Sequence, residues 1–564
     1  MSGSRNRRIY LANTLVSVCL ATLGLVAACG DSDGAGNGTN AGSGGNASAG
    51  SAGKGGAASA GHGGSSAGAA QAGEAGGAGE AGESGEGGQA GAEIGSPGSG
   101  GAAMALSPNC LRDITSGKKV EISPAGNDGL FAATYGPDGL LYAAGYTQPG
   151  VGALEDRSTV VVRLTTNGAL DSTWANEGIA TVNVKATASG LAGLGELPRG
   201  LAFQGDKLIV AGTVETYTTV QNPTALNNDR DVYVFRLNAN GSLDPTFGDD
   251  GSGIHLLPLN AGALVTNATT GAVTLSGADA QWGLNVLPDK RIVVTAATRN
   301  AGLNADNTPR LDTDFAVVKL TESGAQDTTF GLGASGVFTL DIAEAGASVR
   351  TASVLGDGKL IVAGYSSYGG AQRPVIFKLL ADGTGLDPAF GSVGVFSDPV
   401  GTAAEAYGAL VQSGGKLVTV GYGRASSANP SSDILSIRLT SGGVLDTSYG
   451  ATATPGRAWF DVGGLGDNGR AIVLSDDRPV LLGGGSLSTG QQDAVVTLLS
   501  VNGVPVTTFG SPYGCTAYDF GSVGDFFWSG AVAPDGKIAA VGLTGHVSGS
   551  TDDTDGIFVS IDKP

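Results

Sequence analysis

The chain has 564 residues, and its 51 acidic against 31 basic side chains give a formal charge of −20 at pH 7. Proteins that bind nucleic acid neutralise phosphates with Lys and Arg, so this charge argues against a nucleic-acid partner. Beyond its first residues the chain shows no helical spacing of apolar side chains, which argues against a helical fold.

The N-terminus has the pattern of an export signal. Arg5, Arg7 and Arg8 precede an apolar run from Leu11 to Ala28, too short for a stable membrane span. The following Cys29 completes a segment, Leu-Val-Ala-Ala-Cys-Gly, that resembles the lipobox of bacterial lipoproteins. The resemblance implies a lipoprotein signal peptide over residues 1–28 and acyl chains such as palmitate on Cys29. The alternative is an ordinary secretory signal with a chance cysteine.

Residues 29–106 are almost entirely Gly, Ala and Ser, with scattered Glu. Such a segment cannot bury enough apolar area to offset the entropy lost on ordering, so we expect a disordered tether. Gly30, where an Asp would resemble the inner-membrane retention signal, favours the outer membrane of a Gram-negative bacterium. The expected location is therefore the cell envelope, with the membrane as a partner through the lipid.

Residues 107–564 consist of one repeated unit. Residues 353–400 show it most fully, as four short apolar runs rich in Val, Ile and Phe and separated by tight-turn residues. A hairpin signature such as Gly-Asp-Gly-Lys-Leu-Ile-Val-Ala-Gly occurs seven times, and a closing turn such as Leu-Asp-Pro-Ala-Phe-Gly occurs six times. The repeat predicts one four-stranded antiparallel sheet per unit.

The chain ends predict that the sheets close into a ring. The last unit lacks a fourth strand, and residues 118–123 form a lone strand before the first unit. Pairing of these two segments would leave few exposed edges, which favours an all-β, seven-bladed β-propeller closed by an N-terminal strand. An open solenoid is the alternative, but it would not explain why the chain starts on a fourth strand.

Two cysteines remain in the folded part, Cys110 and Cys515, each at a strand beside the predicted closure. In an oxidising compartment they could form a disulfide that staples the ring. Two free buried thiols are the alternative.

The hairpin at Asp357–Gly364 and the turn at Leu386–Gly391 resemble those of the delta-60 repeat family of bacterial β-propeller-like proteins. The resemblance covers residues 118–562 and implies the fold and an envelope or secreted setting. It implies no agreed activity and no catalytic residues. Val506 in place of the turn Asp makes the sixth unit the weakest match.

A cation in the third strand precedes the turn Asp by eight or nine residues in five units, and the sixth unit lacks both charges. Their joint loss predicts five structural ion pairs that brace the turns. The pairs are Arg163–Asp171, Arg236–Asp244, Lys319–Asp327, Lys378–Asp387 and Arg438–Asp446.

Catalytic and metal motifs are weak. The three histidines, His62, His255 and His546, lack zinc-ligand spacing, and no serine stands out as a nucleophile beside His546. Residues 552–555 could offer oxygen ligands to Ca²⁺ but lack EF-hand spacing, so a solvated loop is favoured. We therefore predict no catalytic residue, no metal and no cofactor.

Insertions give the only hint of a ligand site. Loops between the second and third strands, and between successive units, vary in length and share one face, called the variable face below. They are longest in the first three units, and loops on a rigid scaffold often bind ligands. The candidate polar residues are Tyr217, Gln221, Asn222, Asn227, Asp229, Arg299, Asn304, Asp306 and Arg310. Loop drift without a ligand is the alternative.

Together these patterns predict a lipid-anchored, monomeric propeller that acts as a non-enzymatic binding or scaffold module for a protein or polysaccharide. One alternative is a propeller hydrolase or lyase acting on envelope polysaccharide, which would need two carboxylates about 5–10 Å apart. Another is a passive surface spacer with no partner.

Overall fold

The computed structural model describes residues 8–9, 110–124, 126–150, 156–185, 195–216, 229–248, 251–260, 263–266, 273–276, 279–300, 302–304, 310–427, 431–545 and 554–564. The described strands belong to one compact unit, residues 1–10 and 76–564. Cys29, the tether and nearly all of the expected signal peptide lie outside the described residues. Within the described part, no helix has the length and apolar character needed to cross a membrane.

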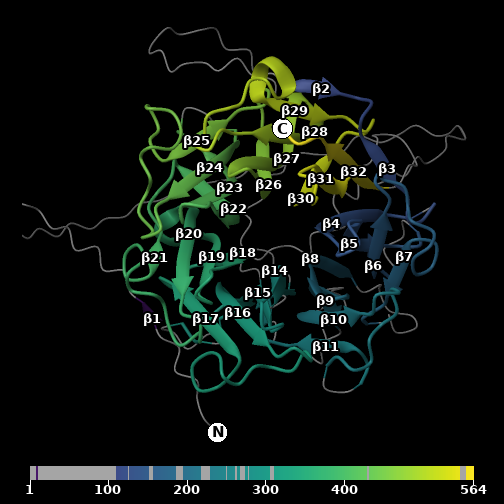
Figure 1. The fold of residues 1–564 in the computed structure, drawn as a ribbon. Coiled ribbons are helices and arrows are strands. Elements are labelled where there is room, and N and C mark those ends of the chain that lie inside the picture. The colour runs from purple at the N-terminus through teal and green to yellow at the C-terminus, as the bar shows by residue number, and fades with distance from the viewer. Residues whose placement is uncertain are drawn as a thin grey trace, which may run out of the picture. The chain divides into compact units, whose positions relative to one another are not determined.

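Seven antiparallel sheets stand side by side in a ring, each with its first strand toward the middle (Figure 1). The chain is a seven-bladed β-propeller, which confirms the fold expected from the repeats.

The blades follow chain order, and their strands run from the inner edge outward. Blade one contains β4 (Asp128–Tyr135), β5 (Leu141–Thr147), β6 (Ser158–Leu164) and β7 (Ile179–Val182). Blade two contains β8 (Glu196–Gln204), β9 (Lys207–Thr216), β10 (Asp229–Leu237) and β11 (Ile254–Leu257). Blade three contains β14 (Ala280–Val286), β15 (Ile292–Arg299), β16 (Thr313–Leu320) and β17 (Val337–Ile342). Blade four contains β18 (Ala347–Val354), β19 (Leu360–Ser366), β20 (Arg373–Leu379) and β21 (Val395–Phe396).

The remaining blades include strands from both ends of the chain. Blade five contains β22 (Ala403–Val411), β23 (Leu417–Arg424), β24 (Asp433–Leu439) and β25 (Arg457–Phe460). Blade six contains β26 (Asp467–Ser475), β27 (Arg478–Ser488), β28 (Gln491–Leu498) and β29 (Cys515–Tyr518), with β2 (Leu111–Asp113) at its outer edge. Blade seven contains β30 (Phe526–Val532), β31 (Ile538–Leu543), β32 (Gly556–Ile561) and β3 (Lys118–Val120).

Two short additions lie outside this pattern. β1 (Arg8–Ile9) pairs with the outer strand of blade three, and β12 (Ala263–Thr266) pairs with β13 (Val273–Ser276). The second pair is a hairpin within the long connection from blade two to blade three.

The N-terminal segment closes the ring in two steps. Just after Cys110, β2 pairs in parallel with β29 of blade six, and Cys110 is disulfide-bonded to Cys515 with a Cα–Cα distance of 5.0 Å. The chain then crosses to blade seven, where β3 pairs antiparallel with β32, as the sequence predicts. The disulfide therefore holds the segment to blade six, while β3 completes blade seven.

The core lies between neighbouring sheets. Ile209 and Val232 of blade two pack with Val294 of blade three, and Val162 of blade one packs with Phe558 of blade seven across the closure. Because both faces of each sheet are covered by the next blade, the strands are apolar on both faces.

The closing turns explain why an aromatic residue recurs in them. Phe330 of blade three is buried, and a Cβ placed on Gly383 in the turn of blade four would lie 2.5 Å from its ring. Only glycine leaves room for the ring at this position. The same contact recurs for Trp174 with Gly241, Phe247 with Gly324, Phe390 with Gly443 and Tyr449 with Gly503.

Candidate functional site

Every innermost strand carries a β-bulge at the same place. In β4, for example, Leu130 pairs with Gly145 and Ala132 with Ala144, so Phe131 is the extra residue. A bulge re-aims a side chain, and here it directs one residue of each blade toward the axis. The seven bulged residues, called the arginine–aromatic ring below, are Phe131, Arg199, Trp282, Arg350, Tyr407, Arg470 and Trp528.

Arginine and aromatic side chains alternate around this ring. The Cζ atoms of Arg199 and Arg350 lie 3.8 and 4.0 Å, respectively, from the centroid of the Trp282 ring. Arg350 and Arg470 lie 4.3 and 4.1 Å from the centroid of Tyr407.

Trp528 completes the circle, since Arg470 and Arg199 lie 4.9 and 5.9 Å from its centroid. Seven is an odd number, so two aromatic residues are neighbours, and Phe131 lies 5.2 Å from Trp528. The aromatic faces attract the guanidinium groups and keep the three cations apart.

A cavity of about 180 Å³ adjoins the ring. All seven ring residues line it, together with residues that follow the bulges in β18, β22, β26 and β30. These strands run toward the hairpins that join the first and second strands, so the cavity lies on the hairpin side of the ring. None of its 15 lining residues is Asp or Glu.

The polar groups of the ring differ in their surroundings. Arg350 pairs with Glu405 at 3.2 Å, and both side chains are fully buried. Arg199 and Arg470 are partly exposed. Among the described residues, Nε1 of Trp282 and the hydroxyl of Tyr407 have no hydrogen-bond partner, although these side chains are 7% and 5% exposed.

We did not predict this site from the sequence, although a signal is present. The innermost strands of five blades align as Asp-Gly-Leu-Phe, Glu-Leu-Pro-Arg, Asp-Ala-Gln-Trp, Asp-Asn-Gly-Arg and Asp-Phe-Phe-Trp. The acidic residue three positions before the bulged residue in these five blades would have identified this column.

Those acidic residues have a structural role at the corners between blades. Each accepts backbone N–H groups from the end of the preceding outer strand, as Glu196 does from Val184 at 2.5 Å and Lys185 at 3.1 Å. Burial raises the pKa of Glu196 to about 7 and that of Asp467 to about 8. These corner carboxylates are Asp128, Glu196, Asp279, Asp467 and Asp525.

Four of the five predicted ion pairs form in the structure. The distances are 2.8 Å for Arg163–Asp171, 2.7 Å for Arg236–Asp244, 3.5 Å for Lys378–Asp387 and 2.9 Å for Arg438–Asp446.

The fifth prediction, Lys319–Asp327, is wrong. Within the described chain Lys319 makes no ion pair with this Asp, because Arg291 donates to Asp327 at 2.9 Å. Lys319 lies instead 5.5 Å from the centroid of the Phe330 ring. Burial, followed by the nearby Arg291, lowers its pKa.

Arg291 belongs to a second set of cations that our sequence reasoning missed. Each follows the first hairpin of its blade and contacts the turn Asp. The set is Lys207, Arg291, Lys359 and Lys416. The signal was the basic residue within the hairpin signatures of these four blades.

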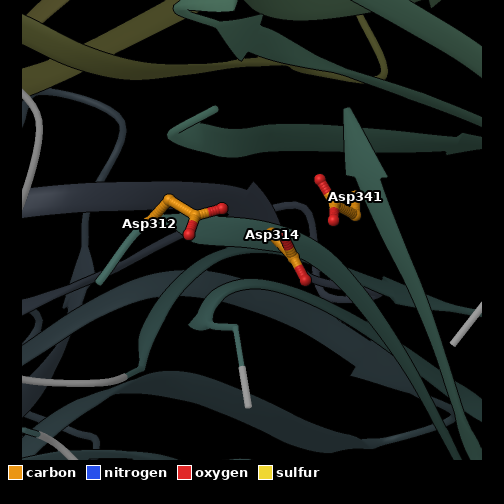
Figure 2. A group of neighbouring side chains, drawn as sticks. All are labelled: Asp312, Asp314 and Asp341. Carbon is orange, nitrogen blue, oxygen red and sulfur yellow. The ribbon is translucent and has the colours of Figure 1, made fainter. Parts of the chain in front are cut away.

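In the part of the chain that the structure describes, three groups of three Asp lie close enough together to hold a cation, and Figure 2 shows Asp312, Asp314 and Asp341. Arg310 pairs with Asp312 and, at 2.7 Å, with Asp341, so a guanidinium already supplies positive charge there. Arg112 does the same for Asp493 and Asp519. The third group is Asp433, Asp461 and Asp467.

This arrangement corrects the expected role of Arg310. It is 3% exposed, so it braces the blade rather than lying on the variable face as a ligand contact.

The other candidate loop residues do not form a described site. Asn304 is exposed, and Asp229 and Arg299 lie at the ends of β10 and β15. Tyr217, Gln221, Asn222, Asn227 and Asp306 lie outside the described residues. The cavity lies on the opposite side of the ring from this face.

One comparison, with models of protein families, agrees with the fold. The family model described as a domain of unknown function (DUF5122) beta-propeller matches residues 204–247 and 355–390. The matches and the seven blades support a bacterial β-propeller family. No curated protein is significantly similar to the chain.

Solved structures with a similar fold are remote in sequence. A protein of unknown function from Dyadobacter fermentans has 10% identity and a TM-score of 0.40, covering 80% of this chain and 99% of its own. An α-L-arabinofuranosidase from Fusarium graminearum has 12% identity and a TM-score of 0.33, covering 64% and 91%. A sialidase from Trypanosoma rangeli has 12% identity and a TM-score of 0.34, covering 80% and 58%. At these values the similarity carries no argument about function.

Proposed function

We propose that this propeller is a non-enzymatic binding module of the bacterial cell envelope, held at the membrane by lipid on Cys29. The observation that carries the proposal is the composition of the axial cavity. Its lining combines three arginines, four aromatic residues and no carboxylate. Aromatic and cationic side chains recognise ligands, whereas glycoside hydrolysis generally needs a pair of carboxyl groups in the site.

The proposed binding site is the axial cavity, whereas the sequence predicted a site on the variable face. The variable-face loops were expected to hold the ligand, but the concave surface that combines charge with aromatic area lies on the axis. A protein or a polysaccharide remains the expected partner, and the propeller is expected to act as a monomer. The arginines of the N-terminus, the apolar run after them and Cys29 support the envelope location that we propose.

The binding claim is tested with the full chain and two polysaccharides, acidic polygalacturonate and neutral dextran, in affinity electrophoresis. A binding module is retarded by one of them while the reducing ends and unsaturated products in the gel stay constant. Release of such products would instead identify a hydrolase or lyase. No retardation by either polysaccharide would contradict the binding claim and favour the passive spacer.

The lipid claim has its own readout. Cells expressing the wild-type chain should incorporate a labelled palmitate analogue into it, whereas Cys29→Ser should abolish the label. Equal labelling of the two proteins, or none in either, would contradict the anchor.

A further inference from the structure

The arginine–aromatic ring has chemistry that goes further than a general binding surface. Its three guanidinium groups share three aromatic rings, so they converge on the axis within one closed circle. Cations brought together repel one another, and the repulsion grows as water is excluded. An anion at this place would lower that energy.

One of the three arginines, Arg350, forms a buried ion pair with a carboxylate. Glu405 pairs with Arg350, and both side chains are fully buried, so this pair belongs to the framework. The cavity lining itself holds three cations and no acidic residue. Arg199 and Arg470 are the two partly exposed arginines, and they are therefore placed to meet a ligand.

Two further donors point to the same kind of ligand. Nε1 of Trp282 and the Tyr407 hydroxyl are buried and have no hydrogen-bond partner among the described residues, and both residues line the cavity. A buried donor without an acceptor destabilises the folded state, so such groups call for an explanation. An indole N–H can only donate, so its missing partner is an acceptor.

The size of the cavity limits the ligand. At about 180 Å³ it is smaller than typical ligand pockets, which range over about 300–1,000 Å³. It suits one acidic group, either a free ion or one residue at the end of a longer chain.

We propose that the arginine–aromatic ring binds an oxyanion, such as a carboxylate, sulfate or phosphate group, through Arg199 and Arg470, with Trp282 and Tyr407 as additional donors. A guanidinium stacked on an aromatic face keeps its N–H edge available, and this edge matches the planar geometry of a carboxylate. This inference rests on the proposed binding function, for which it names the ligand chemistry.

The test titrates the full chain with three probes, galacturonate, galactose and inorganic sulfate, followed by calorimetry and tryptophan fluorescence. Two of the four tryptophans belong to the ring, so binding should change the emission. Galactose lacks the carboxylate and is the matched neutral sugar. Tighter binding of galacturonate than of sulfate would assign an acidic sugar, and the reverse order would assign a free inorganic oxyanion.

Substitutions then locate the site. Arg199→Gln and Arg470→Gln should each weaken binding of the anion at least tenfold, since each removes a charged hydrogen-bond donor. Arg478→Gln makes the same change of charge outside the cavity lining and should leave the affinity unchanged.

Tyr407→Phe separates binding from structural support. It removes only the hydroxyl, so anion affinity should fall severalfold while the melting temperature of the free protein stays constant or rises. A structural hydroxyl would instead lower that temperature without affecting affinity.

Two results would overturn the inference. One is no binding of either anion, with the ring variants changing only stability, which would make the ring a structural plug. The other is galactose binding as tightly as galacturonate. If polysaccharide retention persists in either case, the binding function stands and only the oxyanion site fails.

Discussion

At the scale of single residues, the turn carboxylates stabilise five of the seven blades through ion pairs with nearby cations. Asp244 is 2% exposed and accepts hydrogen bonds from Lys207 at 2.5 Å and Arg236 at 2.7 Å, besides those from Thr246. Burial alone would raise its pKa, but these hydrogen bonds hold the pKa well below the ordinary value. Removing the carboxylate would leave the Arg236 charge buried.

We therefore expect Asp244→Ala to lower the free energy of unfolding by about 3–5 kcal/mol, the usual effect of breaking a buried pair. Urea denaturation measures the change. Asp289→Ala, in an exposed hairpin where the carboxylate is 54% exposed, is the control and should change stability by less than about 1 kcal/mol. Equal effects at the two positions would contradict this role of the turn pair.

Gly383 tests the contact between a closing-turn aromatic and the next blade. Its φ is +67°, and a Cβ would lie 2.5 Å from Phe330. Gly139 has a φ of +77° but no atom within 4 Å of its Cβ position. Ala at either position must adopt a left-handed backbone conformation, which costs about 1–2 kcal/mol. Only Gly383→Ala also places a methyl group against a buried ring, which costs a further amount of about 1–3 kcal/mol. Chemical denaturation should therefore rank Gly383→Ala as the more destabilising, and the opposite ranking would exclude the contact.

At the scale of elements, the corner carboxylates link the outer strand of one blade to the inner strand of the next at five of the seven corners. Burial raises the pKa of Asp128 and Asp525 to about 6, of Glu196 and Asp279 to about 7 and of Asp467 to about 8. Between about pH 4 and pH 8 the folded state thus binds more protons than the unfolded state. Stability should fall as the pH rises through this range. Below about pH 4 the turn carboxylates, whose pKa values are lowered, should reverse the trend.

We expect the free energy of unfolding to be lower at pH 8 than at pH 5 by at least about 2 kcal/mol, since one pKa unit in one group corresponds to about 1.4 kcal/mol. Denaturant titrations at the two pH values measure this difference. Asp467→Asn should reduce it, because the amide does not titrate. Stability that increases from pH 5 to pH 8 would contradict the assignment.

The elements were largely predictable from the sequence, and the site was not. Strand spacing and hairpin residues are local, so β19 and β20 begin within two residues of the runs expected at Leu360 and Val375. Ion pairs between neighbouring strands were mostly found through their joint loss in the sixth unit. The Lys319 pair failed because Arg291 lies outside the two segments compared.

The arginine–aromatic ring depends on contacts between blades rather than on local sequence. Its members are separated by whole blades, and a bulge decides where each side chain points. Periodicity places Arg350 in a strand but does not show that it meets Trp282 of the preceding blade. Only the closed ring brings these residues together, so residue spacing alone could not assign them to one site.

At the scale of the whole molecule, closure joins segments that are far apart in sequence. The Cys110–Cys515 disulfide spans 405 residues and holds the segment that supplies β3 to blade seven. A cross-link over so long a loop reduces the entropy of the unfolded chain, which can stabilise a protein by up to about 5 kcal/mol.

Cys110→Ser with Cys515→Ser should therefore lower the melting temperature, and reductant should do the same for the wild type without affecting the double variant. Scanning calorimetry with and without reductant measures both effects. Identical melting of the four samples would show that closure does not depend on the disulfide.

The axial site follows from that closure, because seven inner strands must surround one axis before Arg199 and Arg470 can reach the same Trp528 ring. The most direct test is a crystal structure of the full chain with galacturonate. The account predicts a carboxylate within hydrogen-bond distance of Arg199 or Arg470, in the cavity lined by Trp282 and Tyr407. A cavity that contains neither galacturonate nor, in a second crystal, sulfate at saturating concentration would contradict the account.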